Sequence, residues 1–237
     1  MAFKYSFILL ALCIGYCSAQ AGLIPIDAPF NADTFCKQIS RDGNYPFPND
    51  CSKFASCTGD IATFQSCSAD LFYNPASDNC VFQKDVECLH RIAENVCYKA
   101  KDSGFGHFTI PRSGTLRQLT LQHKSGFVSC DASNSAAESF WGCGLGFRSV
   151  QMATVVTRQN NTLLFPFFAL GTDGYYGLAR TDFRSRTLTL YNFDGEIQIT
   201  KGEKIRIWHG EDLVNQGEEG NNSGEHCVDV WAVLKRE

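Results

Sequence analysis

The cysteines constrain the fold of this chain more than any other feature, because they are distributed very unevenly. Six lie between Cys36 and Cys88, and only four are spread over residues 97–237. A segment as short as the first buries too little apolar surface to offset its chain entropy, so small domains of this size depend on cross-links. The later segment is long enough to form its own hydrophobic core. The distribution predicts two units, residues 20–88 and 97–237, joined by a short connector at residues 89–96 that we expect to be helical.

Residues 1–19 have the layout of a secretory signal peptide. Lys4 precedes an apolar run from Phe7 to Ile14, and the small residues Ser18 and Ala19 follow it. The run is shorter than the roughly 20 apolar residues of a membrane-spanning helix, and no later segment comes close, so we expect no membrane span. The sequence therefore predicts a secreted, extracellular protein whose ten remaining cysteines are all paired in disulfides.

Charge and sequons bear on possible partners and modifications. Removal of Lys4 with the signal leaves 20 of the 21 basic residues against 25 acidic ones, a net charge of −5. Nucleic-acid binding needs a basic surface, so we expect no nucleic-acid partner. The sequons Asn160-Asn161-Thr162 and Asn221-Asn222-Ser223 predict glycosylation of Asn160 and Asn221 and mark surface loops. The oligomeric state cannot be predicted from the sequence.

From residue 97 onward, apolar residues alternate with more polar ones. The alternating pairs are Leu119 and Leu121, Leu188 and Leu190, Ile197 and Ile199, Ile205 and Ile207, and Val228 and Val230. A period of two places such residues on one face of a strand, and turn signals separate the strands at short intervals. We expect a mostly β chain whose residues 97–237 form an antiparallel β-sandwich or jelly roll. Cys97 and Cys227 lie near the two ends of this unit, and Cys130 and Cys143 bracket a short loop, so we expect these two pairs to form disulfides.

The six-cysteine segment has a distinctive frame. Between consecutive cysteines lie 14, 5, 9, 12 and 7 residues, and the frame contains Tyr45-Pro46, Asn49-Asp50-Cys51-Ser52-Lys53-Phe54, Cys57-Thr58-Gly59 and Leu71-Phe72-Tyr73-Asn74. Spacing alone allows about fifteen disulfide connectivities. The segment resembles the peritrophin-A (invertebrate type 2) chitin-binding domain. The resemblance implies the pairs Cys36–Cys57, Cys51–Cys88 and Cys67–Cys80, and it implies chitin or another N-acetylglucosamine polymer as the partner.

Recognition of such a polymer needs particular side chains. Its sugars present flat apolar faces edged by hydroxyl and amide groups, so a binder needs exposed aromatic rings beside a few hydrogen-bonding side chains. In a hairpin over residues 67–80, Phe72 and Tyr73 point to opposite faces, so we assign Phe72 to the core, as we do Tyr45 and Phe54, and expect Tyr73 to face the ligand. The candidate chitin-binding residues are Phe64, Tyr73, Asn74, Asp78 and Phe82. Members of the family commonly have Trp at the position of Phe82, and the smaller ring implies modest affinity.

Residues 210–226 form an acidic stretch, with five carboxylates and no Lys or Arg. One interpretation is a solvated, flexible loop. The other is a calcium site, because Ca²⁺ prefers carboxylate and amide oxygens, and the candidate donors are Glu211, Asp212, Glu218 and Asn221. A transition metal bound by His209, Glu211 and His226 is a further alternative. Apart from this calcium, we expect no cofactor.

No enzyme signature occurs in residues 97–237, which contain no Gly-x-Ser-x-Gly elbow, His-Glu-x-x-His motif or phosphate loop. The stretches Ser113-Gly114, Leu119 to His123, Trp141-Gly142-Cys143, Ile205 to Trp208 and Cys227 to Val230 are similar to a domain of uncharacterised secreted invertebrate proteins, and this resemblance implies no function. We expect a non-enzymatic, secreted chitin-binding protein with a role in the extracellular matrix or in defence and recognition. One alternative is a polysaccharide-modifying enzyme with an appended chitin-binding module, which would need two carboxyl groups roughly 5–10 Å apart. Another is a six-cysteine domain retained only as a scaffold.

Overall fold

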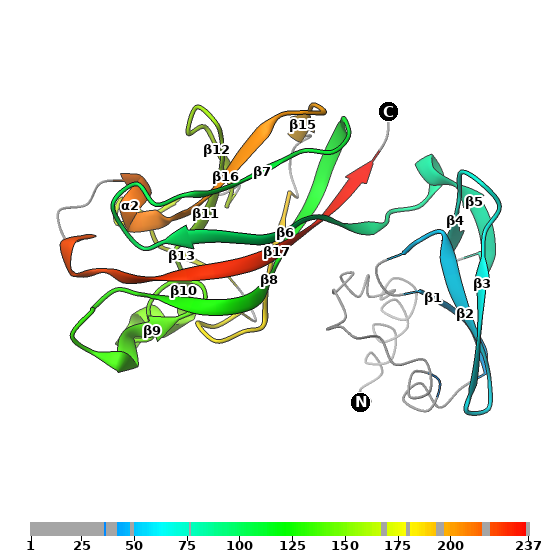
Figure 1. Cartoon of the computed structure of the whole chain (residues 1–237), viewed down its shortest axis with the longest axis horizontal. Helices are drawn as coiled ribbons and strands as arrows, with labels where there is room; N and C mark the ends of the chain where they lie inside the picture. The colour runs from blue at the N-terminus through cyan, green and yellow to red at the C-terminus, as the bar shows by residue number, and fades with distance from the viewer. Residues whose placement is uncertain are drawn as a thin grey trace, which may run out of the picture.

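The computed structural model describes residues 36, 42–47, 50–75, 77–166, 170–178, 181–192, 197–214 and 219–235. The described residues are mostly β, with 54% of them in strands and 11% in helices, as predicted. Figure 1 shows two parts, a small module from β1 to β5 and a larger unit from β6 to β17. The predicted signal peptide, residues 1–19, lies outside the described residues. Within the described part of the chain, none of the helices has the length and apolar character needed to cross a membrane.

Disulfides hold the small module together. It contains the sheet β1 (Gly43–Pro46), β2 (Lys53–Thr58) and β3 (Ile61–Ser66), the hairpin β4 (Leu71–Asn74) and β5 (Asn79–Phe82), and the 3-10 helix η1 (Gln83–Asp85). Apart from its cysteines, the buried apolar residues in the described part of this module are Ala55, Phe72 and Tyr73. Such a small core needs covalent support. The disulfides Cys36–Cys57, Cys51–Cys88 and Cys67–Cys80 provide it, with the pairing that the family resemblance implied.

The larger unit is built from two main antiparallel sheets. The first has the order β14-β8-β17-β6 and comprises β6 (Leu89–Lys99), β8 (Gly114–Ser129), β14 (Thr187–Tyr191) and β17 (Ser223–Lys235), with β9 (Glu138–Ser139) and β15 (Ile197–Ile199) also paired to β8. The second has the order β12-β11-β16-β7 and comprises β7 (Gly106–Thr109), β11 (Thr154–Arg158), β12 (Leu163–Phe165) and β16 (Lys204–His209). The remaining elements are the pair β10 (Gln151–Met152) and β13 (Tyr176–Gly177), the 3-10 helices η2 (Ser135–Ala137), η3 (Gly146–Val150) and η4 (Glu219–Asn221), and α2 (Gly210–Val214).

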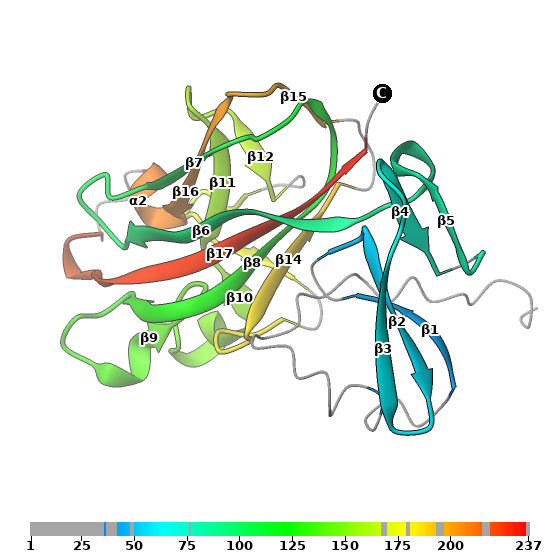
Figure 2. The same cartoon turned by 45° about the vertical axis from the view of Figure 1, so that its right-hand side comes forward.

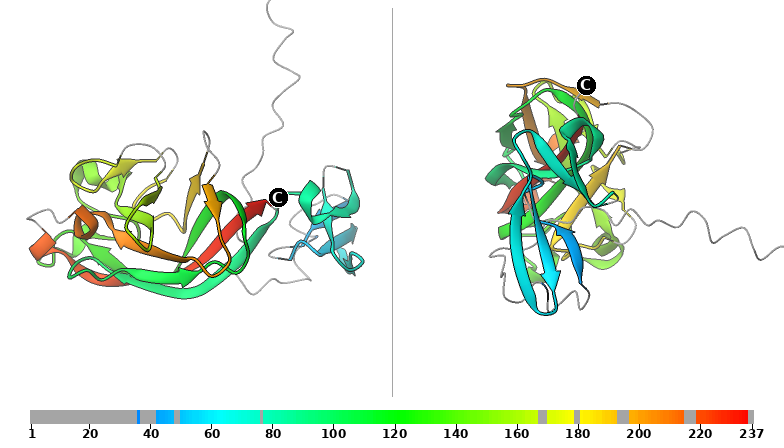
Figure 3. Two further views of the ribbon diagram at one scale, coloured as in Figure 1. Left: turned by 90° about the horizontal axis from the view of Figure 1, so that it is seen from above. Right: turned by 90° about the vertical axis from the view of Figure 1, so that its right-hand side faces the viewer.

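These sheets form a β-sandwich around one hydrophobic core. Figure 2 shows β14, β8, β17 and β6 side by side, and Figure 3 shows the layers of the unit from above. Every residue of the alternating pairs found in the sequence is buried, with an exposed fraction of 8% or less. The sequence prediction of the strands and of their inward faces is therefore confirmed. The two expected disulfides of this unit are also present: Cys97–Cys227 joins β6 to β17, and Cys130–Cys143 closes a loop that contains η2 and β9.

Residues 89–96 are part of a strand, so the prediction of a helical connector was wrong. Strand β6 begins at Leu89, directly after Cys88, and pairs with β17 along its length. Leu89 packs with Trp231 and Val233 of β17 in a cluster separate from the main core. The chain therefore passes from the small module into the large sheet without an intervening linker.

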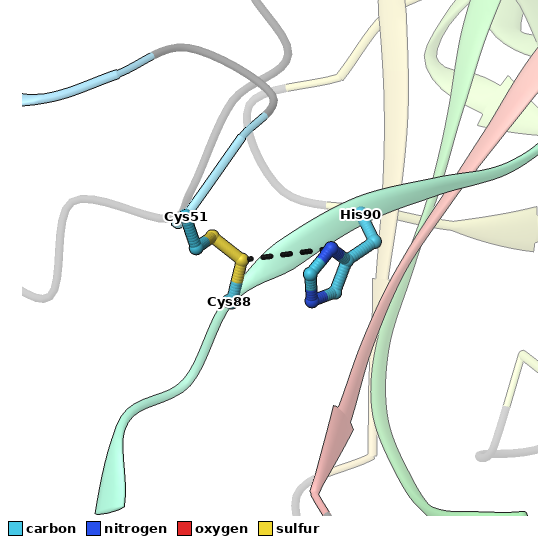
Figure 4. A group of neighbouring side chains, drawn as sticks. All are labelled: Cys51, Cys88 and His90. Atoms are coloured by element: carbon cyan, nitrogen blue, oxygen red, sulfur yellow. Dashed lines mark hydrogen bonds between the residues drawn. A yellow bond between two sulfur atoms is a disulfide. The ribbon is translucent and has the colours of Figure 1, made fainter. Parts of the chain in front are cut away.

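The junction between the two parts is centred on a disulfide, as Figure 4 shows. The Cys51–Cys88 bridge lies beside His90 of β6, whose Nδ1 is 3.8 Å from Sγ of Cys88. On the module side, the ring of Phe72 lies 5.4 Å from the ring of His90. The first residues of the large sheet thus contact the core of the small module.

Candidate functional site

The β4–β5 hairpin carries most of the predicted chitin-binding residues. Its strands pair from Leu71 opposite Phe82 to Asn74 opposite Asn79, and Cys67–Cys80 ties it to the preceding segment. Asn74 and Asp78 therefore lie at the turn, and Phe82 lies at the opposite end. Three residues of strand separate these ends by about 10 Å.

Tyr73 does not face the solvent, so its predicted role as an exposed stacking ring is corrected. Its side chain is only 4% exposed, and its ring stacks on that of Phe54 with centroids 4.7 Å apart. Phe72 and Tyr73 do point to opposite faces, but both faces are covered: His90 lies against Phe72, and Phe54 of β2 lies against Tyr73. Of the other aromatic residues assigned to the core, Phe54 and Tyr45 are half-buried.

Tyr73 instead anchors a polar cluster at the tip of the hairpin. Its hydroxyl donates to the Asp78 carboxylate at 2.8 Å, and the carbonyl of Asn44 lies 3.1 Å away. Burial, followed by the hydrogen bond to Asp78, raises the pKa of Tyr73. The Asn44 side chain donates to Asp78 at 3.0 Å and accepts from the Ser56 hydroxyl at 2.6 Å. The bonds from Asn44 and Tyr73 lower the pKa of Asp78, which stays exposed and ionised.

Asn44 is a candidate site residue that sequence reasoning missed. It lies 34 residues before Asp78, and only the packing of β1 and β2 against the hairpin brings the two together. No local spacing in the sequence signals this contact. The cluster presents a fixed carboxylate and amide groups, which can bind the hydroxyl and acetamido groups of a sugar.

Exposed apolar side chains complete the candidate site. Phe82 is 64% exposed and Phe64 is 41% exposed, so both predicted rings are accessible. Phe64 also makes an edge contact with Phe47, with ring centroids 5.3 Å apart. Asn74, at the turn of the hairpin, is half-buried. The structure thus retains Phe82, Phe64 and Asp78 as accessible candidates.

In the described part of the acidic stretch, two of the five carboxylates are buried, which differs from the solvated loop that one interpretation expected. Glu211 and Asp212 lie in α2 and are 7% and 2% exposed. Asp212 accepts from the backbone amides of Ser103 and Gly104 at 2.8 and 3.0 Å, so both its oxygens are already engaged. The predicted donor Glu218 lies outside the described residues, and Asn221 is exposed. Calcium binding stays a prediction, with Asp212 a poor donor because it stabilises the neighbouring turn.

The proposed transition-metal set is not assembled either. Among the described residues, groups of three His, Cys, Asp or Glu side chains with converging ligand atoms occur only at Cys51, Cys88 and His90 and at Cys97, Glu225 and Cys227. The cysteines of both groups are in disulfides and lack the thiolates that bind metals. His209 and His226 belong to neither group.

The two predicted glycosylation sites lie at the surface. Asn160 and Asn221 are both exposed, whereas Asn222, next to the second site, is fully buried. The Asn160 side chain accepts from the amide of Thr162 at 3.1 Å, as in an Asx turn. Glycosylation at these positions stays a prediction.

Comparison with known proteins found two similarities. Residues 36–88 match the family described as "Chitin binding Peritrophin-A domain". Among solved structures, the chain is similar to AJLec from the sea anemone Anthopleura japonica, with 31% sequence identity and a TM-score of 0.54. The similarity covers 61% of this chain and 94% of AJLec. No curated protein matches the sequence.

Proposed function

Because the chain belongs to the same family as AJLec and residues 36–88 are a peritrophin-A chitin-binding domain, we propose that it is a secreted, non-enzymatic protein that binds chitin. Both similarities support a carbohydrate-binding role, since AJLec is a lectin. In this proposal the small module binds the polymer, and the larger unit is a second recognition unit. Ten paired cysteines suit an extracellular role in the matrix or in defence.

The exposure of Phe82 carries the proposal for the small module. A ring that is 64% exposed at the end of a hairpin closed by a disulfide costs little conformational entropy when it stacks on a sugar face. The polar cluster of Asp78 and Asn44 lies at the other end of the same hairpin. This separation favours an extended polymer over a single sugar, because one ring and one polar cluster then contact different residues of the ligand.

Retention on chitin beads tests the assignment with the full, oxidised chain. Phe82→Ala should reduce the affinity about tenfold or more, as for an aromatic anchor that is buried on binding. Phe82→Trp should increase it, because the indole ring offers a larger stacking face and an N–H donor. Ile61→Ala is the matched control, since Ile61 is 71% exposed on β3 of the same module. Retention should depend little on salt because chitin is uncharged.

Two outcomes would overturn the proposal. If the wild-type chain stays in the supernatant, the small module serves as a scaffold only. If Phe82→Ala and Ile61→Ala bind equally well, Phe82 is not part of the site. Release of soluble sugar from the beads would favour the polysaccharide-modifying alternative instead.

A further inference from the structure

The larger unit has an exposed aromatic residue that its core does not explain. Among the described residues of this unit, the large apolar side chains that are exposed are Phe127, Phe147, Val150 and Leu163. Two of these, Phe147 at 73% and Val150 at 61%, lie together in the short helix η3 and are the most exposed of the four. Single exposed apolar residues are common, but contiguous apolar side chains with a polar rim mark an interaction site.

Polar groups are fixed at the edge of this ring. The guanidinium of Arg148 lies 5.5 Å from the Phe147 ring centroid and 3.9 Å from that of Tyr175. It also forms an ion pair with Asp173 at 3.2 Å. The other oxygen of Asp173 accepts from the amide of Tyr175 at 3.2 Å. Arg148 is thus held by an aromatic ring and by a carboxylate that is itself fixed to the backbone.

The scaffold under these groups is rigid. Tyr175 is 3% exposed and packs in a cluster with Cys143 and Ala153, so the Cys130–Cys143 disulfide supports the floor of the patch. The turn that carries Asp173 and Tyr175 packs against the start of α2. There the backbones of Gly174 and Gly210 lie so close together that a Cβ on either residue would clash with the backbone of the other. Gly174 also has a positive φ of 80°. Such fixed geometry lowers the entropic cost of binding a ligand.

We propose that Phe147, Arg148 and Asp173 form a second carbohydrate site, specific for a neutral pyranose sugar. This inference rests on the proposed function and assigns the site of the larger unit. The Phe147 ring would cover the apolar face of the sugar, and Arg148 and Asp173 would donate to and accept from adjacent hydroxyl groups. The positive charge of Arg148 and the negative charge of Asp173 lie 3.2 Å apart and largely compensate each other. The site therefore favours a neutral sugar over an acidic one.

A protein partner fits this surface less well. The centres of protein interfaces are depleted of charged residues, whereas here an ion pair lies directly beside the exposed ring. A sugar needs this combination, since its hydroxyl groups surround its apolar face. A second copy of the chain packed on Phe147 and Val150 is the competing occupant, and sedimentation measurements distinguish it.

The experiment uses the full chain on an array of neutral hexoses and N-acetylhexosamines displayed as clustered conjugates. Phe147→Ala should lower the apparent affinity about tenfold or more. Arg148→Lys should also lower it, because lysine keeps the charge but loses the planar fork of donors. Phe127→Ala is the matched control, since Phe127 is an exposed phenylalanine on β8 outside the patch. N-acetylglucosamine conjugates can bind either part of the chain, so the variants are compared on the other sugars.

The outcomes separate this inference from the proposed function. On sugars other than N-acetylglucosamine, Phe147→Ala should weaken binding and Phe82→Ala should leave binding unchanged. Absence of wild-type binding to every sugar except N-acetylglucosamine overturns the second site, as does equal binding by Phe147→Ala and Phe127→Ala. Conversion of a wild-type dimer to a monomer by Phe147→Ala, with array binding intact, assigns the patch to a second copy and overturns the inference. If the wild-type chain binds the array but is not retained on chitin, only the proposed role of the small module is refuted.

Discussion

We expect acid to destabilise the larger unit, because two of its histidines are buried in their neutral form. His209, at the end of β16, and His226, in β17, are both fully buried. Burial lowers the pKa of His209 to about 4. Burial, together with the neighbouring His123, lowers the pKa of His226 to about 3. In the unfolded chain, both residues titrate near the ordinary value of about 6.5.

The direction of the effect follows from proton binding. Below about pH 6.5 the unfolded chain binds protons that the folded chain does not, so the free energy of unfolding falls as the pH falls. The contribution is complete above about pH 6.5 and is lost progressively toward pH 4 for His209 and pH 3 for His226. Each histidine accounts for about 1.4 kcal/mol per pH unit, so the two together cost about 4 kcal/mol between pH 7.5 and pH 5. A typical domain has only about 5–15 kcal/mol of total stability.

Tryptophan fluorescence during urea unfolding measures this loss selectively. The three tryptophans, Trp141, Trp208 and Trp231, are all buried in the larger unit, so the small module does not contribute to the signal. His107→Asn is the control, because His107 is exposed on β7, and this variant should lose as much stability as the wild type. His209→Gln should lose about half as much over the same pH range. A wild-type loss below about 1 kcal/mol between pH 7.5 and pH 5 would refute the reasoning.

Three further predictions concern stability. Tyr73→Phe should destabilise the small module by about 1 kcal/mol, through loss of the hydroxyl that is bonded to Asp78 at the hairpin tip; unchanged resistance to proteolysis would count against it. Replacing Cys97 and Cys227 together should cost about 5 kcal/mol, and replacing Cys130 and Cys143 about 3 kcal/mol, because the loops they close span 130 and 13 residues. Equal losses in urea unfolding would contradict this chain-entropy account. If residues 210–226 bind calcium, millimolar Ca²⁺ should raise the melting temperature relative to a chelator, whereas coincident melting curves would exclude the site.

The sequence predicts the strands of the large sheet well where one face of the strand is buried. Leu188 and Leu190, for example, both face the core, and Thr189 between them does not, so the period of two is visible. Strand β6 was missed because its register with β17 is irregular. The pairing shifts near Val230, Asn95 has a positive φ of 49°, and the amide of Asn95 donates to the Asp229 side chain at 3.0 Å. Such a bulge interrupts the alternation that identifies a strand.

The candidate site was predicted only in part, because some of its contacts join segments that are distant in the sequence. Phe82 was predicted to be an accessible ring from its place just beyond the hairpin and from the resemblance to the chitin-binding family, and it is exposed. The burial of Tyr73 was not predicted, because it depends on Phe54 from a neighbouring sheet. The patch around Phe147 combines η3 with a turn some 25 residues later. The ion pair between Arg148 and Asp173 that joins them has no local signature in the sequence. Contacts between distant segments lie beyond what residue spacing reveals.

The direct continuation of the small module into β6 has a mechanical consequence. If the module is attached to a solid polymer, a pulling force enters the large sheet at Leu89 and acts to peel β6 from β17. Each pair of hydrogen bonds would then be loaded in turn, beginning at the pair Leu89 and Val233. The disulfide between the directly opposed Cys97 and Cys227 stops the separation there, because a covalent bond does not yield at forces that break hydrogen bonds. The disulfide would therefore limit the separation of β6 from β17 and keep the core of the larger unit folded under tension.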